Sequence, residues 1–379
     1  MPEIPRNADY TKEYNRKLFL RILRTLPSTR IRIAKQMGLS RTAVSLITDE
    51  LLADDIIEET TEAPNEESRK KNAVYLRLKK NRLFAVGVYL NRDGCSAGII
   101  DICGDVYAQR RLQLSGFRIS EKLDPLADAI EKMLGEAGID KSKLIGIGVS
   151  APGPLDGKNG RILNPPRFDF WHNTDISAYL QGRLHVPAFL ENNTSCLARY
   201  NYKKTGMGGS DDYMVLLVDS GVGAGIVTGG HVLLSLGESA CEFGHISIDY
   251  RGKKCTCGNV GCLESYAAIP SLLKGTSFET WQQVIDSTTE EAAEIIRREC
   301  TYLSTGIVTM ANIINIDTVL LAGDLLYGTE RIMFAIEEMV NSRAIRRNIQ
   351  KIKVLPAYSD LDMEIKAAAD IAFGRFLMI

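Results

Sequence analysis

The sequence lacks any long apolar stretch. None of its runs of uninterrupted apolar residues approaches the length of about 18–20 that a transmembrane helix requires, so a spanning helix is not expected. The first ten residues are polar and contain no hydrophobic signal core, which argues against export. We therefore expect a cytoplasmic protein without a membrane partner. In that compartment its eight cysteines would be reduced, which favours metal binding or burial over disulfides.

The sequence also lacks a net charge of either sign. Its 46 Lys and Arg residues nearly balance its 47 Asp and Glu residues, and the resulting charge of −1 by itself argues against a nucleic-acid partner. The balance hides an asymmetry, because residues 1–82 carry 17 basic and 12 acidic side chains, whereas the rest of the chain carries 29 basic and 35 acidic ones. Residues 11–48 contain nine basic residues and one acidic residue. A basic N-terminal segment therefore precedes an acidic body.

The basic segment has the pattern of a helix-turn-helix. Apolar residues at three- and four-residue spacing predict helices at 14–26, 29–38 and 40–54. Gly38 can turn the chain between the second and third helices, and Ser40 is placed to cap the third. The segment therefore predicts a helical corner of the kind that binds DNA.

A predicted hairpin completes a winged helix. Strand-like runs at 56–60 and 74–78 flank a polar loop that carries Arg69, Lys70 and Lys71. These three cations would contact the DNA backbone or the minor groove.

The third helix is the candidate recognition helix. Arg41, Thr42 and Ser45 lie at its start, where the side chains of a helix-turn-helix reach base edges in the major groove. A helical interaction module with a solvated charged face is the alternative, because small helical corners are common. The N-terminal position, the wing and the local excess of basic residues favour DNA binding.

From residue 83 onward, strands alternate with helices. Residues 84–113 and 213–234 each contain three consecutive strand-like runs around a glycine turn. Further helices are predicted at 121–137, 290–312, 329–340 and 362–378, and further strands at 144–150 and 318–321. Since two halves begin alike, the pattern predicts a duplicated α/β fold with two lobes and a ligand site between them.

One histidine and three cysteines lie within 18 residues of the sequence. They are His245, Cys255, Cys257 and Cys262. Three thiolates and one imidazole form a closed four-coordinate zinc set, and Gly258 and Gly261 would let the loop fold back onto the metal. Because such a set leaves no coordination position for water, the zinc would be structural. The alternative is a group of buried cysteines beside a core histidine.

Five motifs occur in the order seen in the ROK family of repressors and sugar kinases, which the sequence resembles over nearly its whole length. They are GIGVSAPGP at 146–154, EN at 191–192, DSGVGAG at 219–225, EFGH at 242–245 and GCLE at 261–264. The winged helix ahead of this body resembles the repressor branch of the family. The resemblance implies a two-lobed actin-like ATPase (ribonuclease H-like) fold. The domains would be a winged helix at 1–82, an N-terminal lobe at 83–191 plus 362–379, and a C-terminal lobe with the zinc loop at 192–361.

The resemblance also implies the sugar-binding residues. The family's ligands for sugar hydroxyls match Asn192, Glu242, His245 and Glu264, with zinc on the other ring nitrogen of His245. Carboxylates and amides suit adjacent hydroxyls, and a metal-bound histidine has a fixed tautomer. The alternative for Glu242 and Glu264 is that they are surface carboxylates. Trp171 could stack on a sugar ring or lie in the core.

Four departures from the family's kinases affect nucleotide handling or proton transfer. The kinases place an aspartate general base directly after the asparagine of the sugar motif, whereas this chain has Asn193, and an amide cannot accept a proton at neutral pH. The first phosphate loop corresponds to residues 89–93 and lacks its glycines. Asp219 replaces a usual glycine of the second loop, and Asp324 follows Gly323 where the kinases have two glycines.

These matches and departures predict a sugar-responsive repressor of carbohydrate-utilisation genes whose body is not an enzyme. Its partners would be operator DNA, a sugar effector and further copies of the chain, as a homodimer or a dimer of dimers. One alternative is an ATP-dependent sugar kinase with an N-terminal appendage, which would need a base at position 193 and a phosphate cradle. Another is a DNA-binding protein whose body serves only for dimerisation, which the retained hydroxyl ligands disfavour.

Overall fold

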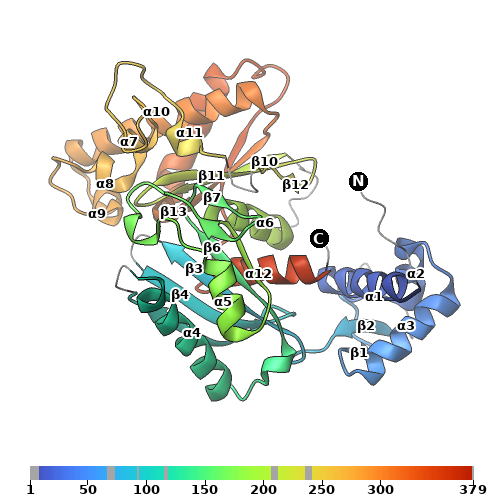
Figure 1. Ribbon diagram of the computed structural model, residues 1–379. Coiled ribbons are helices and arrows are strands. Elements are labelled where there is room, and N and C mark those ends of the chain that lie inside the picture. The colour runs from blue at the N-terminus through green and yellow to red at the C-terminus, as the bar shows by residue number, and fades with distance from the viewer. Residues whose placement is uncertain are drawn as a thin grey trace.

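The computed structural model describes residues 8–65, 73–91, 94–114, 118–205, 212–234 and 241–377. The chain forms a winged helix and two lobes (Figure 1). No helix in these ranges is long and apolar enough to cross a membrane.

The winged helix has the elements that the sequence predicts. They are α1 (Ala8–Thr25), α2 (Arg30–Met37), α3 (Arg41–Ala53) and the antiparallel pair β1 (Ile57–Thr60) and β2 (Tyr75–Leu78). Gly38 ends α2 with a φ of 66°, in the left-handed region that glycine adopts without strain, and the Ser40 hydroxyl accepts a hydrogen bond from the backbone of Ala43 to cap α3. Val44 is fully buried and Ile47 packs beside it, so α3 is held against α2.

The first lobe is built on a five-stranded sheet in the order β5-β4-β3-β6-β9. Its strands are β3 (Phe84–Asn91), β4 (Gly94–Asp101), β5 (Val106–Leu112), β6 (Leu144–Ala151) and β9 (Ala188–Asn192). The first three strands are antiparallel, while β6 and β9 run parallel to β3. Helices α4 (Ile119–Glu136) and α5 (Ile176–Leu184) pack on one face, and α12 (Met363–Leu377) packs on the other.

The second lobe repeats this arrangement in the order β12-β11-β10-β13-β14. Its strands are β10 (Tyr213–Val218), β11 (Val222–Thr228), β12 (His231–Val232), β13 (Thr318–Gly323) and β14 (Lys353–Pro356). Its helices are α6 (Asn193–Thr205), α7 (Glu264–Ala267), α8 (Ile269–Leu272), α9 (Trp281–Asp286), α10 (Glu290–Ile313) and α11 (Thr329–Arg343). Each sheet places its first strand between its second and fourth, so the predicted duplication is confirmed.

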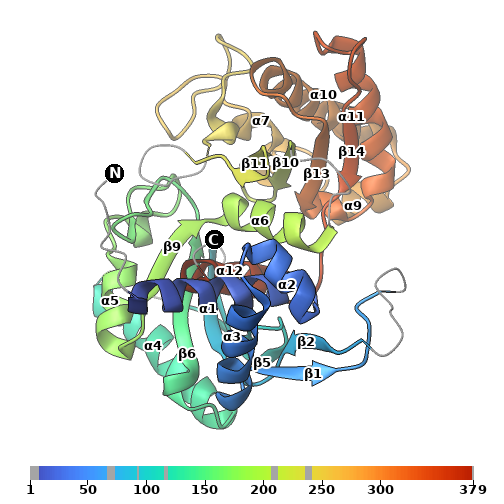
Figure 2. The same cartoon turned by 90° about the vertical axis from the view of Figure 1, so that its right-hand side faces the viewer.

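Two helices, α6 and α12, pack against each other where the lobes meet (Figure 2). A Cβ atom on Gly148 of β6 would lie 1.9 Å from the carbonyl oxygen of Ala368, so α12 packs directly on the first sheet. A Cβ atom on Gly225 of β11 would lie 2.0 Å from the carbonyl oxygen of Thr194, so α6 packs equally closely on the second sheet. Each helix is therefore fixed to a different sheet, and movement between the lobes must change how the two helices meet.

The core of the winged helix continues into the first lobe. Phe19 of α1 belongs to the same cluster of buried side chains as Ile102, after β4, and Phe373 of α12. The Arg24 guanidinium of α1 forms an ion pair with Asp370 of α12, and its Nε donates to the carbonyl oxygen of Ile102 at 3.2 Å. The winged helix is thereby attached mainly to α12, one of the two helices at the lobe junction.

Candidate functional site

A cavity of about 100 Å³ lies between the two lobes. The four residues that the resemblance assigns to sugar binding all line it: Asn192, Glu242, His245 and Glu264. Asn91 and Pro152 contribute from the first lobe. The cavity is smaller than the roughly 300–1,000 Å³ of typical small-molecule sites, so this arrangement of the lobes leaves room for a monosaccharide-sized ligand only if the cleft opens slightly.

Asn192 ends β9 and opens α6, where it faces the cleft. Its Oδ1 accepts hydrogen bonds from the backbone N–H of Thr194 at 2.9 Å and from the Thr194 hydroxyl at 2.8 Å. No described residue accepts a hydrogen bond from its Nδ2 group, which can therefore donate to a ligand oxygen. The Asn192 side chain is therefore fixed through its Oδ1, and its Nδ2 is available to a ligand.

The Glu264 carboxylate is held from both lobes. Its Oε1 accepts from Arg167 at 2.6 Å, and its Oε2 accepts from the backbone N–H of Val222 at 3.1 Å. Only 6% of the Glu264 side chain is exposed, against 37% of that of Arg167. Because the contact with Arg167 crosses the cleft, the position of the Glu264 carboxylate depends on how the two lobes lie relative to each other. Nothing in the sequence pairs these two residues, which are 97 positions apart, and Arg167 is not among the predicted site residues.

The Glu242 side chain is exposed at the cleft, yet protein flanks its carboxyl on several sides. Desolvation is the largest influence and raises the pKa of this carboxyl, His245 lowers it, and the nearby Glu264 carboxylate raises it. Two carboxylates and a histidine thus converge on one small space. Such a set can accept hydrogen bonds from the adjacent hydroxyls of a sugar.

His245, Cys255, Cys257 and Cys262 come together as the sequence predicts. Their candidate ligand atoms lie within 4.8 Å of one another, and among them His245 Nδ1 is 3.6 Å from Cys255 Sγ and Cys257 Sγ is 3.7 Å from Cys262 Sγ. Tetrahedral zinc with these ligands separates neighbouring ligand atoms by about 3.5–3.8 Å, so these two separations fit that ion. Because Nδ1 faces the cysteines, the other ring nitrogen of His245 is left for the cleft.

The loop backbone explains how three cysteines reach one point. Lys254 pairs with Val260, and Ser247 pairs with Cys262, in isolated antiparallel bridges. Gly261 has a φ of 74°, and a Cβ atom there would lie 1.8 Å from the carbonyl oxygen of Asp249. Only glycine therefore fits at this turn. Burial raises the pKa of the Cys262 thiol to about 12, and a bound cation would reverse this shift by favouring the thiolate.

Trp171 does not line the cleft. It is buried in the core of the first lobe, where its ring stacks on that of Phe168 with a centroid distance of 5.9 Å. The Lys122 ammonium lies 5.1 Å from the Trp171 centroid. Of the two roles considered for Trp171, the structure supports the core role, in which it anchors the segment that carries Arg167.

The candidate recognition helix is open to solvent at its start. Arg41 and Thr42 are exposed, and Ser45 is half-buried on the same part of α3. Arg32 and Lys35 of α2 are exposed as well. Arg69, Lys70 and Lys71 of the predicted wing lie outside the described residues. The structure therefore places the base-reading candidates on an accessible surface, while the wing contacts stay a prediction.

A sequence model described as the ROK family matches residues 86–372. Over 379 aligned residues the chain is 25% identical to the xylose repressor of Bacillus spizizenii, covering 98% of this chain and 97% of that protein. It is 26% identical over 359 residues to the DNA-binding transcriptional dual regulator NagC of Escherichia coli, covering 90% of this chain and 87% of that protein.

Solved structures show the same fold. A ROK family transcriptional regulator described as a homologue of the E. coli MLC protein matches with a TM-score of 0.81 at 21% identity, over 97% of this chain and 98% of that chain. The ROK hexokinase from Thermus thermophilus matches with a TM-score of 0.63 at 24% identity, over 76% of this chain and 97% of that chain. The fold is thus shared with regulators along nearly the whole chain and with kinases over three quarters of it.

Proposed function

Because the chain belongs to the ROK family, we propose that it is a sugar-responsive transcriptional repressor of carbohydrate-utilisation genes. The observation that carries this proposal is the joining, in one chain, of an accessible helix-turn-helix to a cleft lined by Asn192, Glu242, His245 and Glu264. The similarity to proteins named xylose repressor and NagC along nearly the whole chain supports it. The proposed domains are residues 1–82, 83–191 with 362–379, and 192–361.

In the cleft, the amide of Asn192 donates to a sugar oxygen while Glu242 and Glu264 accept from hydroxyls. We assign zinc to His245 and the three cysteines, where it would fix the loop and the ring orientation of His245. The metal has a structural role because its four ligands close the coordination shell. Arg167 holds Glu264 in place and joins the two lobes around the ligand.

We further propose that the body is not an ATP-dependent kinase. The Asn193 Nδ2 donates to the carbonyl oxygen of Leu90 at 3.1 Å, and its Oδ1 accepts from the Ser150 hydroxyl at 2.6 Å. The first of these bonds needs an amide, and an aspartate in its place would put two oxygens together. Position 193 therefore joins β3 and β6 to α6 instead of acting as a base.

The second phosphate loop forms a hydrogen bond within itself. The Asp219 carboxylate accepts a hydrogen bond from the backbone N–H of Gly221 at 2.9 Å. Phosphate binding in such loops depends on free backbone N–H groups and is opposed by a carboxylate. In the loop that would bind a nucleotide phosphate, the Asp219 carboxylate therefore already accepts a backbone N–H and would repel the phosphate.

The sugar signal reaches the winged helix through α6 and α12. Asn193 ties the start of α6 to the first lobe, whereas the body of α6 packs on the second sheet. Movement of the lobes to accommodate a sugar would shift α6 against α12, and α12 carries the winged helix through Asp370. In a homodimer or a dimer of dimers, this shift would change the spacing of two winged helices on a two-fold operator. The proposed location is the cytoplasm.

The test is a thermal-shift screen of the full chain against pentoses, hexoses and N-acetyl sugars, followed by an assay of sugar phosphorylation with MgATP. We expect at least one sugar to raise the melting temperature by mass action, and no sugar to be phosphorylated. The Glu242→Gln variant should lose the shift. Its matched control, Glu338→Gln on the exposed face of α11, should keep it. Sugar phosphate formation by the purified protein would contradict the proposal.

A further inference from the structure

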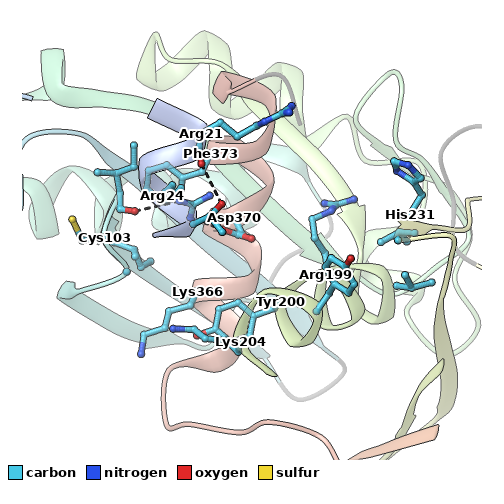
Figure 3. Close-up of a pocket in the computed structure, with 18 residues that line it drawn as sticks. Arg21, Arg24, Cys103, Arg199, Tyr200, Lys204, His231, Lys366, Asp370 and Phe373 are labelled. Atoms are coloured by element: carbon cyan, nitrogen blue, oxygen red, sulfur yellow. Dashed lines mark hydrogen bonds and ion pairs between the residues drawn. The ribbon is translucent and has the colours of Figure 1, made fainter. Parts of the chain in front are cut away.

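A second cavity lies on the other side of α6, between the winged helix and both lobes. Its volume is about 830 Å³, within the range of small-molecule sites and larger than the sugar cleft. Figure 3 shows that Arg21 and Arg24 enter it from α1, Lys366 and Asp370 from α12, and Arg199, Tyr200 and Lys204 from α6. His231 of β12 lies at its far end.

The walls of this cavity are strongly cationic. Five of the described lining residues are Lys or Arg, and one, Asp370, is acidic. Arg24, Arg199 and Lys366 have acidic partners: Asp370, Glu191 at 2.7 Å and Asp360 at 3.1 Å, respectively. Arg21 and Lys204 form no ion pair with any described residue. No carboxylate of the described residues therefore balances either charge, although the Lys204 ammonium lies 5.4 Å from the ring centroid of Tyr200 and 5.9 Å from that of Tyr358.

One buried donor in the cavity also lacks a partner. Arg24 uses Nε and one terminal nitrogen for Ile102 and Asp370, but its Nη1 is buried and has no hydrogen-bond partner among the described residues. A buried donor without an acceptor is unfavourable, and a small shift of the Arg24 side chain toward the cavity would let an oxygen of a bound anion satisfy it. A second observation, independent of the charge balance, therefore points to an anionic ligand.

Much of the rest of the lining is apolar or aromatic. It includes Ile100, Val227, Val232, Tyr202 and Phe373. A purely inorganic ion would leave this surface uncovered, whereas a small organic molecule with an anionic end would fill both parts. Guanidinium and ammonium groups approach from three elements, which suits a phosphate monoester with its three outer oxygens better than a planar carboxylate.

We propose that this cavity binds a small phosphorylated metabolite of about the size of a sugar phosphate. The phosphate contacts Arg21, the Nη1 of Arg24 and Lys204, and the organic part lies against Tyr202 and Phe373. The ligand would touch α1 and α12 on one side and α6 on the other. It therefore sits where the proposed sugar signal passes, but its binding depends neither on the sugar cleft nor on the proposed function.

The experiment measures binding to the full chain by isothermal titration and thermal shift at constant ionic strength. The probes are glucose 6-phosphate, AMP, inorganic phosphate, citrate and glucose. We expect a phosphorylated organic probe to bind more tightly than inorganic phosphate and citrate. The paired substitution Arg21→Ala with Lys204→Ala should weaken that binding by about tenfold or more, since each removes a charged hydrogen-bond donor. Both side chains are exposed, and the melting temperature without ligand reports whether the variant folds.

Two controls locate the site. Lys132→Ala removes an exposed cation of α4 outside the cavity and should leave binding unchanged. Glu242→Gln alters the sugar cleft and should also leave it unchanged. Binding that is lost with Glu242→Gln but retained in the Arg21 and Lys204 variant would place the ligand in the cleft and overturn the proposal. No binding of either phosphorylated probe, or equal shifts with phosphate and citrate in every variant, would overturn it as well.

Discussion

The ion pair between Arg24 and Asp370 is predicted to carry much of the attachment between the winged helix and the body. Its side chains are 16% and 6% exposed, so the pair is largely shielded from water. The Arg24 guanidinium also lies 4.3 Å from the centroid of the Phe373 ring, which faces it from the same helix as Asp370. One arginine of α1 thus makes an ion pair and a ring contact with α12, beside the apolar cluster that the winged helix shares with the first lobe.

The perturbation is Asp370→Asn, which removes the negative charge and keeps the shape of the side chain. Breaking a fully buried pair costs about 3–5 kcal/mol. Because Arg24 retains some contact with solvent, we expect a loss of about 2–3 kcal/mol in the free energy of unfolding. Arg24→Met removes the other charge, and the double variant should be less destabilised than the sum of the two single ones by about 2 kcal/mol.

Urea unfolding of the wild type, the two single variants and the double variant measures this coupling. The Arg110–Glu136 pair serves as a control, because both of its side chains are more than a third exposed and such pairs contribute about 0–1 kcal/mol. Effects of Arg24→Met and Asp370→Asn that add within about 0.5 kcal/mol would refute the assigned attachment. The Asp370→Asn protein should also respond less to sugar in DNA binding.

Three further predictions concern other parts of the chain. Cys257→Ser should lose zinc, as measured by metal analysis. It should also lose the sugar-induced thermal shift, because the metal orients His245. Unchanged sugar affinity in the metal-free protein would contradict this link. Arg41→Ala should weaken binding to a selected operator by about 1–3 kcal/mol with little effect on random duplexes, and equal losses on both would remove Arg41 from base recognition. Burial raises the pKa of Glu299 well above its unfolded value of 4.5, and neither of its oxygens has a partner among the described residues. Because the folded state binds the proton of Glu299 more tightly than the unfolded state, the stability of the protein falls as the pH rises above 4.5. Glu299→Gln should therefore raise the melting temperature more at pH 8 than at pH 5. Equal effects at the two pH values would contradict a buried acid at this position.

The winged helix could be predicted because its signals are local. Ser40, Gly38 and the apolar spacing each act within a few residues, and all three take the predicted role. The Cys/His cluster could be predicted as well, since its four residues lie within 18 positions of the sequence. The strand β9 and the helix α6 were not predicted, because β9 has only five residues and α6 follows it without a turn. Their junction places Asn192 in the cleft, so the sequence motif indicated this candidate sugar-binding residue although the strand and helix around it were not predicted.

The part of the site that escaped prediction depends on tertiary contacts. Arg167 meets Glu264 only because Phe168 and Trp171 bury their rings in the first lobe and hold the intervening segment at the cleft. The cationic cavity likewise joins α1, α6 and α12, which are separated by most of the chain. The excess of basic residues in the N-terminal segment was visible in the sequence. The sequence alone could not show which of these basic side chains face DNA and which, such as Arg21 and Arg24, face the body.

Whether a sugar in the cleft controls DNA binding is tested most directly by the operator affinity of one preparation, measured with and without the sugar that raises its melting temperature. We expect saturating sugar to change the dissociation constant by about 5–150-fold. The Glu242→Gln variant should lose this change and bind the operator normally without sugar. An operator affinity that is the same with the cleft empty and with the cleft filled would contradict this control.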